Sequence, residues 1–335
     1  MSRSAGDEHV DVVIIGGAIM GSSAAWWLSR EPGFDGSILV VDRDFSYEGS
    51  STATTNSCMR QQFSNEVNIR ISQFAAEYVR DFRSWFDDPD VPEIATQHFG
   101  YMYLASDDDF AATLRANQAK QAAWGAGTRI MSPAEIAADY PFYELGDIVC
   151  GSHNLVDEGW FDAAAIFETW RAQARRNGVE YREDPVVAID TTGGRVTSVT
   201  LASGTTVSCG AVVNAAGVRA AQVASMVGAE LPVEARKRFS FVFDAAEPLD
   251  RPLPLTIDPN GMHVRTDGDH YQAGIGPDPD PAVDPTDLTM DTDIWEDVVW
   301  PALAHRIPAF ERIKVISRWA GHYAYNTLDH NVVVL

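Results

Sequence analysis

The chain has 335 residues, of which 45% are hydrophobic, and it carries a formal net charge of −23 with a pI near 4.5. This length fits about two globular domains. So acidic a surface repels the phosphates of nucleic acids and of anionic membranes, so we expect neither as a partner. No apolar run reaches the roughly 18 to 20 residues of a membrane span.

The cysteines are Cys58, Cys150 and Cys209. No two of them have the spacing of metal ligands, and an odd, scattered set fits a reducing compartment. The first residues contain Asp7 and Glu8 and lead directly into an apolar run, which is typical of neither a signal peptide nor a transit peptide. We therefore expect a cytoplasmic protein without a metal site.

The first predicted unit, Val10 to Asp42, is a strand, a glycine turn, a helix and a second strand. The turn reads GGAIMG, in which Gly16 makes the tight bend, Ala18 replaces the second glycine of GxGxxG, and Gly21 lets the helix pack against the strand. The helix start offers free amides to an anion, and Asp42 is placed to bind ribose hydroxyls. This order predicts a dinucleotide site. An ordinary βαβ turn is the alternative, but it leaves Asp42 and Ala18 unexplained.

Periodicity and turn residues predict the remaining elements in chain order. Helices are expected at 19–30, 67–86, 107–124, from 133, at 163–177, 218–227 and 288–305. Strands are expected at 10–15, 37–41, 100–105, 179–182, 185–190, 195–201, 205–209, 211–217, 238–244, 263–265, 269–273 and 314–319, with a strand-like end at 331–335. The apolar stripe of 67–86 predicts a core contact, and Ser132 and Asp162 are expected to cap helices.

Five stretches together resemble the D-amino-acid-oxidase-like family of FAD-dependent oxidoreductases, in its branch of glycine, sarcosine and dimethylglycine oxidases and dehydrogenases. They are GGAIMGSSAAWWL with Asp42, SSTATTNSCMRQQFS, AVVNAAG, GMHVRTDGDHYQAG and RWAGHYAYNTLD, in the family's order over nearly the whole chain. The resemblance implies an α/β fold, α+β overall. A Rossmann-like FAD-binding domain (8–98, 145–230 and 310–335) would be interleaved with an antiparallel-sheet substrate domain (99–144 and 231–309).

The same resemblance implies which residues contact FAD. They are Gly16, Gly17, Ala18, Gly21, Asp42, Arg43, Ser50, Ser51, Thr52, Val187, Ala215, Ala216, Gly217, Trp319 and Gly321. In monomeric sarcosine oxidase a cysteine in the late segment tethers the flavin, but here that segment reads GHYAYN, so FAD is expected to bind non-covalently. Relatives continue beyond this point with a Gly-rich turn and a helix that close over the flavin, so we expect the chain to be C-terminally short and its retention of FAD to be weakened.

Five residues are candidates for the chemistry. Arg265 and Arg60 are candidate carboxylate anchors, because a guanidinium binds a carboxylate through two parallel hydrogen bonds. For Arg265 the alternative is a surface ion pair in an acidic protein, whereas Arg60 also fits stabilisation of the reduced ring. His263 lies two residues before Arg265 and so shares its face of the strand. It would deprotonate the substrate amine or hydrogen-bond the substrate, or be purely structural. One of His322 and Tyr323 is expected in the pocket.

The resemblance implies oxidation of the C–N bond of a small, N-alkylated amino acid or related amine by hydride transfer to flavin. The acceptor would be oxygen, an electron-transfer protein or a quinone, and the absence of lysine between Gly261 and Gly276 favours a dehydrogenase. Two alternatives remain open: oxidation of a 2-hydroxy acid on the same fold, and a flavin-binding assembly or scaffold protein without turnover.

Overall fold

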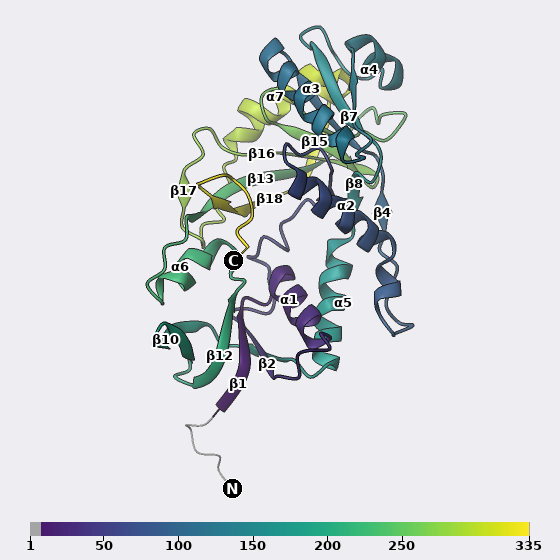
Figure 1. Cartoon of the computed structure of the whole chain (residues 1–335). Coiled ribbons are helices and arrows are strands. Elements are labelled where there is room, and N and C mark those ends of the chain that lie inside the picture. Colours follow the sequence, from purple (N-terminus) through teal and green to yellow (C-terminus); the bar gives the residue numbers. More distant parts are fainter. Residues whose placement is uncertain (1–7, 335) are drawn as a thin grey trace.

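A six-stranded sheet forms one half of the molecule (Figure 1). The computed structural model describes residues 8–334. β1 (Glu8–Ile15) runs parallel to β2 (Ile38–Asp42) on one side and to β12 (Thr206–Asn214) on the other. β9 (Glu180–Glu183) runs parallel to β2 at one edge, while β11 (Arg195–Leu201) and β10 (Val186–Thr192) extend the other edge in antiparallel fashion. The carboxyl ends of β1, β2 and β12 therefore meet at one edge, where the predicted dinucleotide site lies.

Helices cover both faces of this sheet because its β-branched strands are buried on both sides. α1 (Ile19–Ser29) packs with α5 (Ala163–Arg176), and the rings of Trp26 and Trp170 stack with centroids 6.2 Å apart. Val223 of α6 (Ala220–Ser225) joins the apolar cluster on the other face. The strand, turn, helix and strand predicted for the N-terminal unit are thus all present.

The second large sheet has nine strands and lies above the first in Figure 1. Its longest members, β13 (Val233–Ala245) and β18 (Ile313–Asn326), pair antiparallel along nearly their whole length. The remaining strands are β5 (Tyr101–Ala105), β6 (Arg129–Met131), β7 (Cys150–Asn154), β14 (Leu255–Ile257), β15 (His263–Asp267), β16 (His270–Ile275) and β17 (Ala282–Val283).

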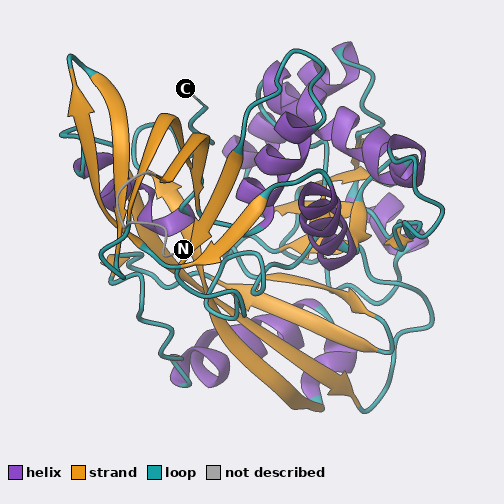
Figure 2. Cartoon of the chain, turned by 90° about the horizontal axis from the view of Figure 1, so that it is seen from below, coloured by secondary structure: helices purple, strands orange, loops and turns teal. Residues whose placement is uncertain are grey.

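One face of this sheet packs against helices. Phe239, Phe241 and Phe243 alternate along β13 and enter the core with Trp295 and Leu303. Trp295 belongs to a π-helical turn, 295–299, that leads into α7 (Trp300–Arg306). The opposite face of the sheet, here called the cleft face, is turned toward the loop that follows β2. Figure 2 shows the helices gathered around the sheets.

The other helices are α2 (Glu66–Arg80), α3 (Asp108–Ala123) and α4 (Pro133–Asp139), and a small three-stranded sheet contains β3 (Cys58–Met59), β4 (Thr96–Gln97) and β8 (Gly159–Phe161). Short 3-10 turns lie at 82–85, 217–219 and 308–311. Side chains of Asn65, Asp107, Ser132 and Asp162 cap the starts of α2, α3, α4 and α5, and Ser132 forms a full capping box with Glu135. The predicted caps Ser132 and Asp162 are confirmed.

Several predicted element boundaries are wrong. Gly210 does not divide two strands, since β12 is continuous, and β18 continues through the GHYAYN segment instead of ending at 319. The helix predicted at 288–305 begins only at Asp293, and 218–227 splits into a 3-10 turn and the short α6. Residues 331–334 form no strand, and Leu335 lies outside the described residues. Local sequence patterns missed these points because cross-strand pairing, not intrinsic propensity, sets strand length.

The apolar stripe of α2 is only partly core. Tyr78 and Phe82 are buried, but Val67, Ile71 and Phe74 are 64%, 53% and 52% exposed. Ile69, Ala76 and Val79 are buried as well, so one side of the helix is core along most of its length. The prediction that the whole stripe is core is wrong.

Strand pairing also bears on the predicted division into domains. β7 and β18 hydrogen-bond within the nine-stranded sheet. Both lie in segments that were assigned to the FAD-binding domain from sequence. By strand pairing, 150–154 and 313–326 belong with the second sheet, and the remaining boundaries stay a prediction.

Candidate active site

The glycine turn after β1 has no room for side chains. Gly16 has φ +102°, and a Cβ on it would lie 2.4 Å from the Ala215 carbonyl oxygen. A Cβ on Gly21 would lie 1.7 Å from the Gly16 oxygen. The Ala215 amide donates to the Ile15 oxygen at 2.8 Å, which continues β12 beside the turn. Two chain segments far apart in sequence therefore form one close-packed cradle, as the pattern of small residues predicts.

Asp42 closes this cradle from the tip of β2. Its Oδ2 accepts a hydrogen bond from the Gly17 amide at 2.6 Å, and Oδ1 accepts one from the Arg43 amide at 2.7 Å. Beside them, the Tyr47 hydroxyl is buried and has no hydrogen-bond partner within residues 8–334. Burial raises the pKa of this phenol, so it stays protonated and can donate to a ligand.

The start of α1 differs from those of its neighbours. α2, α3, α4 and α5 are each capped by a side chain, whereas the cap position of α1, Ala18, contributes none and its first turn has no acidic residue. Thr52 Oγ1 accepts from the Ile19 amide at 3.3 Å. The remaining amides and the helix dipole are free for an anion. The glycine cradle, the uncapped helix and the unpaired Tyr47 hydroxyl together fit the pyrophosphate and ribose of a dinucleotide.

The loop that follows β2 joins this cradle to β18. Ser51 Oγ donates to the His322 carbonyl oxygen at 2.7 Å, and the Trp319 indole donates to the Thr54 carbonyl oxygen at 3.1 Å. A Cβ on Gly321 would lie 2.5 Å from Thr54 Oγ1. Ser51, Trp319 and Gly321 are thus brought together by this loop, as their assignment to one cofactor site requires.

Two other predicted cofactor segments have irregular backbone. Val187 is 53% exposed, and the β10–β11 register shifts between Val186 and Ala188, so Val187 is the extra residue of a β-bulge. A bulge leaves the main chain of its extra residue unpaired. Gly217 has φ +55° and follows Ala215 and Ala216 directly after β12. Ser50 begins the turn that leads to Thr54.

The strand register decides which of His322 and Tyr323 faces the cleft. Lys237 pairs with His322, and Lys237 lies on the same face of β13 as Phe239, which is packed against the helices. His322 therefore points away from the cleft, and its Nε2 donates to the Asp287 carbonyl oxygen at 2.9 Å. Tyr323, the next residue, lies on the cleft face. Only Tyr323 is placed to reach a substrate.

His263 and Arg265 share the cleft face, as predicted from their spacing. Asn56 contacts both: its Nδ2 lies 2.9 Å from His263 Nε2, and its carbonyl oxygen accepts from Arg265 Nη2 at 3.4 Å. Ser240 donates to Asn56 Oδ1, so the amide nitrogen is the group that faces His263. Burial, and then the positive charge of nearby Arg265, lowers the pKa of His263 to about 4. The imidazole is therefore neutral at physiological pH, and its Nε2 lone pair is already engaged.

Arg265 is held by its own surroundings. It is 4% exposed, and Nη1 donates to the Thr266 carbonyl oxygen and to Asp267 Oδ1, both at 2.8 Å. Gln272 accepts from the other terminal nitrogen. A guanidinium that is this deeply buried and already paired with a carboxylate is a poor receptor for a second one. The geometry supports the ion-pair alternative for Arg265, although the arginine of that pair is buried and only Asp267 is partly exposed.

Arg60 has a different environment. Its guanidinium lies 4.5 Å from the centroid of the Phe63 ring, and Nη1 donates to the Tyr103 hydroxyl at 2.6 Å. Its Nε is buried without a partner, and no carboxylate lies within ion-pairing distance of it among the described residues. Arg265 Nε also lacks a partner, so Arg60 differs from Arg265 in having no carboxylate beside it among the described residues.

Glu158 was not among the residues predicted from the sequence. It is fully buried next to Arg60; Oε1 accepts from the Gln61 and Gln62 amides at 2.6 and 3.1 Å, and Oε2 from Gln62 Nε2 at 3.0 Å. Burial raises the pKa of this carboxyl to about 7. Its hydrogen bonds fix the backbone that follows Arg60. No sequence motif marks it, because its partners lie almost a hundred residues away.

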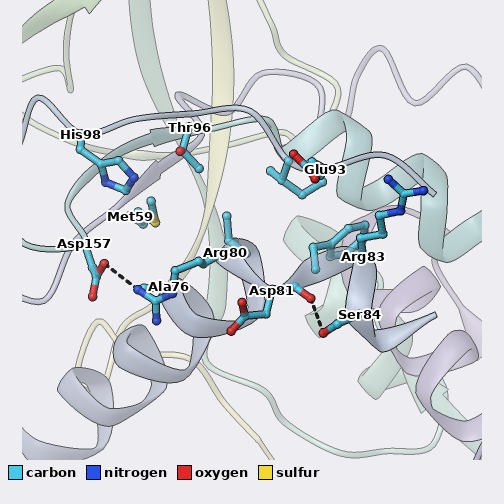
Figure 3. A pocket seen from close by; sticks show the side chains of 13 residues that line it. Met59, Ala76, Arg80, Asp81, Arg83, Ser84, Glu93, Thr96, His98 and Asp157 are labelled. Atoms are coloured by element: carbon cyan, nitrogen blue, oxygen red, sulfur yellow. Dashed lines mark hydrogen bonds and ion pairs between the residues drawn. The ribbon is translucent and has the colours of Figure 1, made fainter. Parts of the chain in front are cut away.

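A cavity of about 510 Å³ lies elsewhere, between α2 and the small sheet (Figure 3). None of the predicted site residues lines it. Arg80, on its wall, is paired with Asp157 at 3.3 Å, and Arg83 donates to the Pro89 carbonyl oxygen. The cavity is therefore separate from the cradle and the cleft face.

Within residues 8–334, no cluster of acidic, cysteine and histidine side chains is suited to a metal ion. The same part of the chain contains no helix long and apolar enough to cross a bilayer.

The chain is similar in sequence and in fold to known proteins. "FAD-dependent oxidoreductase domain-containing protein 1" of Bos taurus is 34% identical over 98% of this chain and 74% of its own length. The fold is similar to that of L-proline dehydrogenase from P. horikoshii, with TM-score 0.80 and 23% identity over 96% of this chain and 83% of that one. Glycine oxidase from Geobacillus kaustophilus gives TM-score 0.79 and 17% identity over 96% and 84%.

The predicted fold and the predicted cofactor, FAD, are confirmed. Residues 11–334 match the DAO family, described as FAD dependent oxidoreductase, and the chain belongs to that family of flavoenzymes.

Proposed function

We propose that the protein oxidises the C–N bond of a small amino acid, N-alkylated or cyclic, or of a related amine. The observation that carries this proposal is Arg60, a cleft-facing guanidinium with an unpaired Nε and no carboxylate partner among the described residues. A planar fork of this kind matches a carboxylate. The solved structures of similar fold include an L-proline dehydrogenase and a glycine oxidase, which supports a substrate with both an amine and a carboxylate.

The residues around Arg60 would hold such a substrate. The Tyr103 hydroxyl fixes one edge of the guanidinium, and Glu158 holds the following backbone. His263, being neutral, adds no positive charge that would repel a substrate amine. When bound, FAD accepts the two electrons and the hydrogen removed from the substrate carbon. The protein supplies orientation and excludes water.

We further propose that FAD is held non-covalently. The GHYAYN segment contains no cysteine, and His322 points to the helix side of the sheet. The FAD contacts of Ser50, Thr52, Arg43 and Val187 are proposed from the family resemblance. The electron acceptor and the cellular compartment stay predictions from the sequence.

The test is an anaerobic titration of the FAD-loaded protein with N-methyl amino acids, proline, simple amines and 2-hydroxy acids, followed by flavin absorbance. Bleaching by an amino acid but not by the amine lacking its carboxylate supports the proposal. In Arg60→Gln the concentration of amino acid needed should rise about 10- to 100-fold, as expected for a lost charge-assisted pair. Bleaching by hydroxy acids alone would replace the proposal with 2-hydroxy-acid oxidation. Flavin that no compound reduces would favour a scaffold role.

A further inference from the structure

Arg238 is a further guanidinium on the cleft face and was not among the predicted site residues. It lies between Lys237 and Phe239 on β13, so its side chain points to the side opposite the core phenylalanines. Its guanidinium carbon lies 4.7 Å from the centroid of the Tyr323 ring. It is also close enough to His263 for its charge to act on that imidazole. Arg238 therefore belongs to the same polar wall as His263 and Tyr323.

A carboxylate of the protein itself already occupies Arg238. Asp280 accepts from Nη1 and Nη2 through its two oxygens, each at 2.9 Å. This is the two-point geometry by which a guanidinium binds a carboxylate. Asp280 comes from the Pro- and Asp-rich loop between β16 and β17, two residues before the point where β17 pairs with β13.

Arg265, Arg60 and Arg238 therefore differ in the carboxylate that pairs with each of them. Arg265 is 4% exposed and pairs with Asp267, two residues away on the same strand. Arg60 has no carboxylate within ion-pairing distance in the described part of the chain. Arg238 has one, supplied by a loop, and its side chain keeps 23% of its surface exposed while that of Asp280 keeps 28%. A pair with this exposure can be opened by a competing ligand.

We propose that Arg238 is a carboxylate receptor of the substrate cleft and that the Asp280 carboxylate fills it until a small carboxylic acid displaces it. This rests on the proposed function, because it assumes an amino-acid substrate at the cleft face. Asp280 then sets the affinity of the cleft for an external carboxylate, because only molecules with a free Arg238 can bind it. Release of Asp280 also frees the loop 276–281, so substrate binding and loop position are coupled.

The test measures acetate binding to the FAD-loaded full chain, by flavin absorbance changes and by calorimetry. Asp280→Asn keeps the shape of the side chain but removes its charge, so acetate should bind at least about fivefold more tightly. Arg238→Gln should abolish this gain, and the double variant should bind acetate like Arg238→Gln alone. Acetamide, which is neutral, should show no gain in any variant. Arg238→Lys, which keeps the charge without the planar fork, should bind acetate more weakly than the native protein.

Asp250→Asn is the matched control. Asp250 also accepts two hydrogen bonds from one arginine, Arg251, and its loss changes the net charge by the same amount, but the pair is a surface pair of adjacent residues. Its acetate affinity should equal that of the native protein. Unchanged acetate affinity in Asp280→Asn, with native melting behaviour, would overturn the proposal. If Asp280→Asn gains affinity but no amine reduces the flavin, the receptor stands and the proposed substrate class fails.

Discussion

Replacing Glu158 with glutamine tests the environment of Arg60 most sharply. The native carboxyl is fully buried, and its pKa is raised to about 7 from an ordinary value of 4.5. In the folded protein it therefore holds a proton that the unfolded chain releases, so this group makes the folded state less stable as pH rises from 4.5 toward 7. A difference of about 2.5 pKa units corresponds to about 3 kcal/mol of unfolding free energy.

Glutamine cannot ionise, so the unfolding free energy of the variant does not fall with pH through this group. It has a fixed penalty instead: an amide nitrogen would face Gln62 Nε2, and the hydrogen bond now accepted by Oε2 would be lost, which costs about 1–3 kcal/mol at any pH. The native protein should therefore be the more stable of the two near pH 4.5. The difference in unfolding free energy between the native protein and the variant should shrink by up to about 3 kcal/mol by pH 7.5.

The assay is urea unfolding of both proteins at several pH values between about 4.5 and 7.5, with circular dichroism as the signal and FAD at one saturating concentration. His153 and His263, whose pKa values fall to about 4 chiefly through burial, make stability rise with pH over part of this range. They contribute equally to both proteins, so the difference between the two curves isolates Glu158. A difference that is constant across this range would refute the reasoning.

Three further predictions concern the cradle and the cleft. Gly21→Ala should lower stability by at least about 1–3 kcal/mol and abolish FAD binding, because the new Cβ would lie 1.7 Å from the Gly16 oxygen; thermal melting and FAD fluorescence quenching check this. Asp42→Ala should weaken FAD binding about 10- to 100-fold in the same titration, since the Gly17 and Arg43 amides lose their acceptor; native affinity would contradict the cradle geometry. Tyr323→Phe should raise the KM for the amino acid. His322→Gln should change the melting temperature and leave that KM unaltered. The reverse pattern would show that the register argument is wrong.

The sequence predicts the cradle well because its determinants are local. Gly16, Gly21 and Asp42 lie within one strand–helix–strand unit, and each is a residue type that its position requires. His263 and Arg265 follow in the same way from the two-residue period of a strand. These inferences need no knowledge of distant contacts.

The cleft could not be predicted to the same depth. Whether His322 or Tyr323 faces the substrate depends on the pairing of β18 with β13, and one strand alone does not reveal it. Arg265 and Arg60 look alike in sequence, and only Asp267 beside one and Tyr103 beside the other distinguish them. Asp280 and Arg238 meet across forty-two positions through a loop whose composition indicates nothing more than an irregular connection.

The central claim, C–N oxidation by an FAD-dependent enzyme, is tested most directly by product stoichiometry. The FAD-loaded protein is reduced without oxygen by one amino-acid substrate, and the amine or ammonia and the carbonyl compound are counted against the flavin reduced. Two electrons leave the substrate as its C–N bond becomes an imine, and water then splits the imine. We predict one amine and one carbonyl product for each flavin reduced with an acyclic substrate. Flavin reduction without release of an amine would contradict the account.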